Sequence, residues 1–163
     1  MLPHYQKILF ATDLSAGAAE VLRHAISLAR AYQSEVAILH VLPDVNPSVI
    51  NEVALVMGTE QLADYELAHT DDVMDTIRQQ VQRLAAQELA DHPDDLARIK
   101  SIEVHHGPPA TTILEEAERC GADLLVLGAH GRKKLKYALL GSVAKRVILH
   151  AAIPVLLVHL DTP

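Results

Sequence analysis

Five predicted strands, most of them short apolar runs, alternate with helical patterns along this chain of 163 residues, and this alternation limits its fold more than any other feature. The predicted strands span residues 7–12, 35–42, 99–106, 124–127 and 154–160. Apolar residues at helical spacing predict helices over about 15–32, 73–91, 109–120 and 141–151. Short runs without alternation suit strands buried on both faces. We therefore predict an α/β protein, with helices on both faces of a five-stranded parallel sheet.

The ends of two predicted helices carry residues that are typical of caps. Ser15 is expected to cap the first helix through its side chain. Gly121 is expected to end the helix over 109–120. The segment from Asp44 to His69 is harder to assign, and it contains an apolar patch at 53–57. We interpret it as an insertion with room for one short helix.

Composition limits the class of protein. A chain of this length suits one domain, 1–163, which buries roughly two-thirds of its unfolded surface. The formal net charge of −7 argues against a general nucleic-acid binder. No apolar run approaches the roughly 18 residues that a membrane span needs, and the first seven residues do not resemble a secretory signal. Cys120 is the only cysteine, which fits a cytoplasmic protein and a packing role for its thiol.

A glycine-rich segment, GAHGRKKLKYALLGS, covers residues 128–142 between the fourth predicted strand and the fourth predicted helix. Gly128, Gly131 and Gly141 follow the spacing Gly-x2-Gly-x9-Gly, and Ser142 comes next. Glycine lets bare backbone N–H groups approach a phosphate, and such turns often need φ > 0. Six of the fourteen Lys and Arg residues fall between 132 and 146, although the chain is acidic overall. The segment therefore predicts a site for a small anion.

The order of the predicted elements also indicates where a ligand binds. In an open parallel sheet, ligands lie beyond the carboxyl ends of the strands, where the strand order reverses. The first strand ends at Ala11-Thr12-Asp13, and the fourth ends at Leu127-Gly128. If these strands are neighbours at the reversal, Asp13 and the glycine segment face one crevice. The N-terminus of the helix that follows then adds partial positive charge.

Segments spread over nearly the whole chain together resemble the universal stress protein family. The matching segments are 7–15, 39–41, 107–109, 128–142 and 153–158. The Gly-x2-Gly-x9-Gly-Ser pattern matches all four anchor positions of the ATP-binding subgroup. Ala11 is a departure, because some ATP-binding members have proline there. The resemblance implies a doubly wound, Rossmann-like sheet of the adenine nucleotide alpha hydrolase type, in the order 3-2-1-4-5.

The resemblance implies a stress or signalling regulator that responds to ATP or another adenine nucleotide, with Mg²⁺ or Mn²⁺ held through the phosphates. Asp13 then contacts the ribose or the hydration shell of the metal, and Val41 meets the adenine through its backbone. Family members commonly form homodimers through the last strand, here 154–160. The residues implied in nucleotide binding are Ala11, Thr12, Asp13, Val41, Leu127, Gly128, His130, Gly131, Arg132, Gly141, Ser142 and Val143.

The same residues also have plainer interpretations. The glycines suit ordinary turns and caps, and Asp13 suits a cap of the first helix. Lys133, Lys134 and Lys136 suit a solvated loop, with one of them reaching the phosphates as the alternative. His130 suits an ordinary loop position, with a catalytic role as the alternative.

Several enzyme motifs are missing from the sequence. There is no Gly-x4-Gly-Lys-Ser/Thr, no Gly-x-Gly-x2-Gly after the first strand, no Gly-x-Ser-x-Gly and no His-x-Gly-His. His105 and His106 point to opposite faces of a predicted strand, so we expect no zinc site there. Enzyme activity stays uncertain. The alternatives are slow ATP hydrolysis involving His130, and a protein adaptor that docks through the patch at 53–57 and keeps a vestigial nucleotide site.

Overall fold

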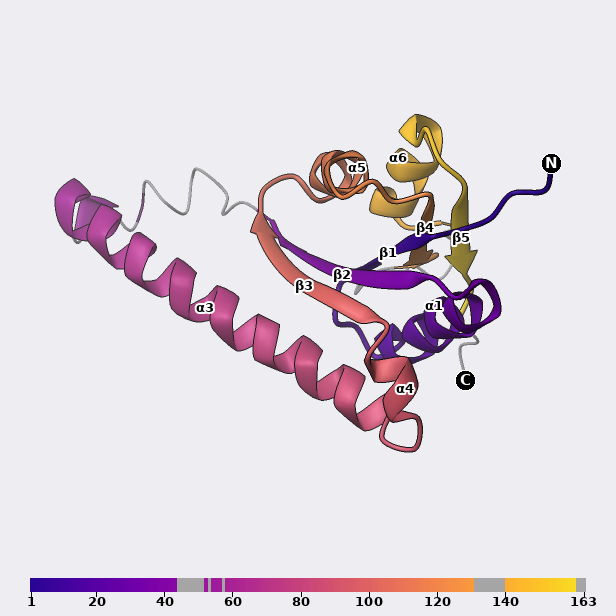
Figure 1. Ribbon diagram of the computed structural model, residues 1–163. Helices are drawn as coiled ribbons and strands as arrows, with labels where there is room; N and C mark the ends of the chain where they lie inside the picture. Colours follow the sequence, from indigo (N-terminus) through magenta and orange to yellow (C-terminus); the bar gives the residue numbers. More distant parts are fainter. Residues whose placement is uncertain (44–51, 53, 57, 131–139, 161–163) are drawn as a thin grey trace.

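The computed structural model describes residues 1–43, 52, 54–56, 58–130 and 140–160. Within them, five parallel strands form one sheet in the order β3-β2-β1-β4-β5, so the implied order is confirmed. The strands are β1 (Lys7–Thr12), β2 (Glu35–Leu42), β3 (Ile99–His106), β4 (Leu124–Gly128) and β5 (Val155–Val158). The order reverses between β1 and β4, which are neighbours inside the sheet (Figure 1).

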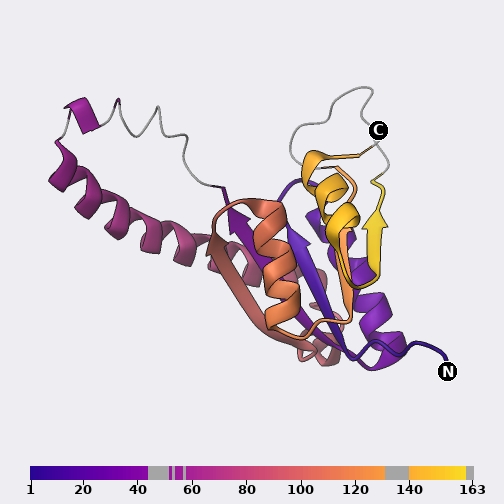
Figure 2. The same cartoon turned by 90° about the horizontal axis from the view of Figure 1, so that it is seen from above.

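Helices cover both faces of this sheet. Their bounds are α1 (Ala18–Tyr32), α3 (Thr59–Glu88), α4 (Pro93–Leu96), α5 (Pro109–Arg119) and α6 (Ser142–His150). Figures 1 and 2 show α1 and α3 on one face and α5 and α6 on the other. In the described part of the chain, no helix has both the length and the hydropathy that crossing a membrane requires.

Alternate residues of each strand supply two aliphatic cores, one on each face. Ile8 and Phe10 of β1 pack toward α1 and α3, whereas Leu9 and Ala11 pack toward α5 and α6. All four side chains are buried. Because both of their faces are covered, the inner strands β1, β2 and β4 are apolar with little alternation, which is the pattern that predicted them.

The predicted cap of α1 is wrong. The helix begins at Ala18, and its N-cap is Gly17, which makes no side-chain capping bond. Ser15 takes part through its backbone instead, since its carbonyl accepts the N–H of Ala18 at 3.0 Å. The N–H of Ser15 donates to Asp13 Oδ1 at 2.9 Å. The residues after β1 form a tight turn before the helix starts, and this turn takes up the position where a cap was expected.

Helix α3 differs most from the prediction. It begins at Thr59, inside the segment interpreted as an insertion, and it is 30 residues long. Its carboxyl-terminal half packs on the sheet, through residues such as Val81 and Ala85. The amino-terminal half projects beyond the sheet in Figures 1 and 2. Val73, where the helical pattern was expected to resume, is 44% exposed and lies inside the helix, so that pattern did not mark the start of α3.

The remaining boundaries differ less. Gly121 ends α5 as predicted, in the left-handed conformation with φ 68°, and the N–H of Ala122 donates to the carbonyl of Ala117 at 2.9 Å. The short helix α4 was not predicted. The last strand, β5, ends at Val158 rather than at residue 160. Cys120 is half-buried against the core of α5 and α6, which agrees with a packing role.

Candidate nucleotide-binding site

A cavity of about 680 Å³ opens beyond the carboxyl ends of β1, β2 and β4, where the strand order reverses. This volume lies within the range of about 300–1,000 Å³ that is typical of small-molecule sites. Its lining includes the residues that follow β1, the start of α6 and parts of α3 and α5. The place agrees with the general rule for ligands of open parallel sheets.

The two ends of the glycine segment meet at the floor of this cavity. Ala129 is fully buried, and its carbonyl accepts the N–H of Gly141 at 2.7 Å. The N–H of Ala129 donates to the carbonyl of Val158, at the end of β5, at 2.9 Å. A backbone bond thus joins the two described ends of the segment, and Gly141 leads directly into α6.

Gly128 and Gly141 have backbone conformations that other residues can adopt. Gly141 has φ −66° and ψ 156°, which is extended backbone. Positive φ occurs at Gly58, Gly107 and Gly121 but not at Gly128 or Gly141, so the expectation of φ > 0 is wrong for these two. A Cβ added at Gly128 would meet its nearest atoms at 3.5 Å, an ordinary contact. Neither φ nor crowding by other residues therefore explains the glycine at 128, and φ does not explain the glycine at 141.

A tight turn, residues 12–15, forms the wall of the cavity beside β1. The hydroxyl of Thr12 accepts the N–H of Leu14 at 3.0 Å. The carboxylate of Asp13 accepts the N–H of Ser15 at 2.9 Å. Asp13 therefore bonds to a backbone N–H of this turn, ahead of α1, whose N-cap is Gly17. Leu14 has φ 57°, a left-handed conformation that costs about 1–2 kcal/mol for a residue with a side chain.

The cavity gathers ten of the twelve residues implied in nucleotide binding. They are Ala11, Thr12, Asp13, Val41, Leu127, Gly128, His130, Gly141, Ser142 and Val143. Gly131 and Arg132 lie outside the described residues, as do Lys133, Lys134 and Lys136. Residues from both ends of the chain therefore share one cavity, as the strand order requires.

Other lining residues were not anticipated from the sequence. Ile77 and Gln80 reach the cavity from α3, and Leu160 reaches it from the segment after β5. Leu160 packs closely on Gly17, where an added Cβ would lie 1.7 Å from its Cδ1 atom. His40 is buried, and its Nδ1 lies 2.7 Å from the carbonyl oxygen of Thr12. The sequence shows His40 as a polar residue within the apolar run of β2 and inside the matching segment 39–41, but neither observation gave it a role in the site.

The polar groups of the cavity suit a phosphorylated ligand. The N-terminus of α6 adjoins it at Ser142 and Val143, and the first N–H groups of a helix attract anions. His130 also lines the cavity, with its ring 6.1 Å from the ring of His159 in an edge-to-face arrangement. Among the described residues, no group of three or more His, Cys, Asp and Glu side chains is arranged to hold a metal.

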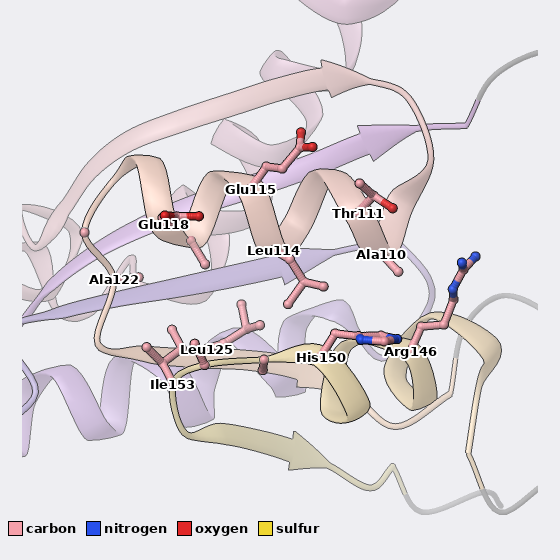
Figure 3. Close-up of a pocket in the computed structure, with 14 residues that line it drawn as sticks. Ala110, Thr111, Leu114, Glu115, Glu118, Ala122, Leu125, Arg146, His150 and Ile153 are labelled. Carbon is pink, nitrogen blue, oxygen red and sulfur yellow. The ribbon is translucent and has the colours of Figure 1, made fainter.

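A second cavity, of about 650 Å³, lies between α5 and α6 (Figure 3). Leu114, Leu125 and Ile153 contribute apolar surface, while Glu115 and Glu118 contribute carboxylates. None of the residues implied in nucleotide binding lines it. Arg146 and His150 line it as well, so charge does not decide between the two cavities. The cavity at the carboxyl ends of the strands is the better candidate because it holds the residues implied in nucleotide binding.

Comparisons with known proteins agree with this fold. Universal stress protein MJ0531 of Methanocaldococcus jannaschii is 34% identical over 158 residues, which are 94% of this chain and 82% of that protein. The solved structure of MJ0577, from the same organism, has a TM-score of 0.76 at 28% identity and covers 99% of this chain and 100% of that one. A universal stress protein solved in complex with cAMP shares the fold at a TM-score of 0.56 and 22% identity, over 96% of this chain and 98% of that one.

A family model extends these pairwise matches. The model of the universal stress protein family matches residues 4–159, which are nearly the whole chain. This match includes every strand and helix that the structure describes. The chain belongs to the universal stress protein family.

Proposed function

We propose that this chain binds ATP, or another adenine nucleotide, in the cavity at the carboxyl ends of β1, β2 and β4. One observation carries the proposal, namely that a single cavity gathers ten of the twelve residues implied in nucleotide binding. The cAMP complex of a protein with the same fold supports an adenine nucleotide as the class of ligand. The Gly-x2-Gly-x9-Gly-Ser spacing supports ATP and membership of the ATP-binding subgroup.

The chemistry of the cavity changes from one end to the other. Leu39, Val41 and Ile77 give apolar surface near β2 and α3, which suits a base. Gly141 and Ser142 lie at the N-terminus of α6, where backbone N–H groups and a hydroxyl suit phosphates. In the proposed pose the adenine lies against Val41, and the phosphates lie against the glycine segment.

A divalent cation fits this arrangement. Mg²⁺ and Mn²⁺ prefer oxygen ligands, and the cavity lining offers the carboxylate of Asp13 and the hydroxyl of Ser142. In the proposed role, Mg²⁺ or Mn²⁺ neutralises the phosphates and is held mainly through them. Asp13 then binds the ribose or the water shell of the ion.

We further propose a cytoplasmic homodimer that regulates a stress response according to its bound nucleotide. Strand β5 lies at one edge of the sheet, beside β4 only. Val155, Leu156 and Leu157 are each half-buried in the single chain. An edge strand with partly exposed aliphatic side chains is a natural place for a second copy.

Native mass spectrometry of freshly purified protein, followed by identification of released molecules, tests the proposal. The expected result is one ATP or ADP per chain on a dimer, with retention that requires Mg²⁺. Gly141→Val serves as the matched variant, because its backbone angles suit any residue. We expect it to fold normally and to arrive without nucleotide. Wild-type protein that is empty and takes up no ATP with Mg²⁺ contradicts the proposal.

A protein adaptor is the second candidate. Leu55 and Val56 are 87% and 86% exposed, which is unusual for large aliphatic side chains. They precede the projecting half of α3 in the chain. Substituting both with Ser should abolish saturable binding of a protein partner and leave ATP affinity unchanged. Loss of ATP affinity instead would link this segment to the nucleotide site.

A further inference from the structure

His40 has no part in the contacts proposed above, although it is buried in the wall of the same cavity. It lies on β2 after Val36 and Ile38, at the spacing that fills the core beneath α1 and α3. His40 therefore places an imidazole on the face of β2 where the two preceding positions are aliphatic. Burial of such a group is unfavourable unless it is hydrogen-bonded.

The bond that His40 makes crosses from β2 to β1. Its Nδ1 lies 2.7 Å from the carbonyl oxygen of Thr12, which is also its register partner in the parallel pair. A carbonyl oxygen can only accept a hydrogen bond, so Nδ1 carries the proton and donates it. The donor is present in this tautomer of the neutral ring and also in the charged ring.

The acceptor belongs to the peptide group that joins Thr12 to Asp13. Because a peptide group is planar, fixing its oxygen also fixes the nitrogen and Cα atom of Asp13. The next residues are held by the bonds to Leu14 N–H and Ser15 N–H, and Leu14 is left-handed at φ 57°. A strained turn of this kind persists only where its surroundings determine it. The imidazole is the anchor that comes from a neighbouring strand.

We infer that His40 is a positioning residue for the nucleotide site, acting through Asp13. Its bond to the carbonyl of Thr12 holds the turn over 12–15 in the shape that directs Asp13 toward the ligand. The inference rests on the proposed function for the ligand itself. It adds a residue that touches no nucleotide and yet sets the affinity for it.

The test compares two polar replacements of His40 with one apolar replacement. Asn places an amide nitrogen near the position of Nδ1, whereas Gln places one near Nε2, away from the carbonyl. We expect His40→Asn to bind ATP within about threefold of the wild type, and His40→Leu and His40→Gln to bind about tenfold more weakly, as expected for loss of one buried donor. Isothermal titration with ATP and Mg²⁺ gives these affinities.

A double-mutant cycle shows whether His40 acts through Asp13. If it does, adding His40→Leu to Asp13→Ala weakens binding little beyond the loss caused by Asp13→Ala alone. Ser34→Ala is the matched control, because Ser34 Oγ donates to the carbonyl of Tyr5 at 2.5 Å at the opposite end of β2. Like His40→Leu, this substitution removes a side-chain bond to a backbone carbonyl near β1. We expect it to leave ATP affinity unchanged.

Amide hydrogen exchange measured without nucleotide separates this inference from the proposed function. Loss of the His40 anchor should speed exchange at Leu14 and Ser15 in His40→Leu but not in His40→Asn or Ser34→Ala. Unchanged exchange, or additive affinities in the cycle, overturns the role of His40. Wild-type protein that binds no ATP overturns the proposed function, and the exchange rates then still decide whether His40 holds the turn.

Discussion

At Gly141, a single substitution is expected to change binding of the proposed ligand without weakening the fold. It is the N-cap of α6 and provides no side-chain cap. Asp is a favoured N-cap, so Gly141→Asp should hold or raise the free energy of unfolding by a few tenths of a kcal/mol. The same carboxylate would occupy the N–H groups offered to phosphate and repel it. ATP binding should therefore be lost while stability is kept, which titration and urea unfolding measure together.

Two control variants make that prediction sharper. Gly141→Asn caps the helix without charge, so it separates competition for the N–H groups from repulsion. Gly121→Ala forces a side chain onto φ 68° and should cost about 1 kcal/mol of stability without changing ATP affinity. Full ATP affinity in Gly141→Asp would contradict a phosphate site at the start of α6.

Residues of the candidate site that belong to a recognisable sequence pattern could be predicted. Residues whose role depends on contacts in the folded structure could not. Gly128, Gly141 and Asp13 were identified because their spacing and their place after strands carry information. Leu14 and His40 gave no comparable signal. The left-handed φ of Leu14 is imposed by the turn around it, and the donor of His40 matters only because Thr12 ends the neighbouring strand. Both depend on contacts between elements, which a single sequence does not display.

At the scale of elements, Asp95 joins three pieces of the fold. This carboxylate is 5% exposed and pairs with Arg30 of α1, and it accepts a bond from Arg98 Nε at 3.3 Å just before β3. The hydrogen bond from Arg30 lowers the pKa of Asp95 from its ordinary value, although burial opposes the change. We expect Asp95→Asn to lower the free energy of unfolding by about 1–2 kcal/mol at pH 7.

The pH dependence of that loss follows from the direction of the pKa. A carboxyl whose pKa is lower in the folded state stabilises the fold at pH values above its unfolded pKa, and this effect is lost as pH falls through the folded pKa. The gap between wild type and Asp95→Asn should therefore close in acid, as urea unfolding at pH 7 and pH 3 would measure. Asp75→Asn is the control, because Asp75 is 66% exposed beside Arg78 and should change stability by less than about 0.5 kcal/mol. An equal gap at both pH values would contradict the assignment.

Elements that pack along their whole length were the ones the sequence predicted well. β1 and β2 have the predicted bounds because burial on both faces leaves a nearly continuous apolar run. β3 also has the predicted bounds, although it lies at an edge of the sheet and only Val104 is buried in it. The start of α3 was not predicted, because the pattern that was followed begins only at Val73, whereas the helix begins at Thr59. The short α4 has Pro93 at its start and two acidic residues in its first turn, but four residues are too few to show apolar periodicity.

On the scale of the whole molecule, the candidate site is connected to an edge of the sheet. Gly141 donates to the carbonyl of Ala129, and Ala129 donates to the carbonyl of Val158. These bonds join the start of α6 to the end of β5 through one residue. A nucleotide bound as proposed at the start of α6 would therefore lie close to the strand proposed to pair with a second copy. In the proposed dimer, these bonds would link the nucleotide site to the contact between subunits.

The free edge of β5 gives the last prediction. The carbonyl of Pro154 accepts the N–H of Leu125 at 3.0 Å, and the carbonyl of Val158 accepts the N–H of Ala129 at 2.9 Å, so both point toward β4. Because backbone groups alternate along a strand, Val155 directs its N–H and carbonyl away from β4. Val155→Pro removes that outward donor, so a dimer built through this edge should become a monomer in sedimentation velocity, with the circular dichroism of the sheet retained. Leu156→Pro is the matched control, because it removes an inward donor and should destabilise the fold instead. A Val155→Pro variant that stays fully dimeric would place the contact between subunits on another surface.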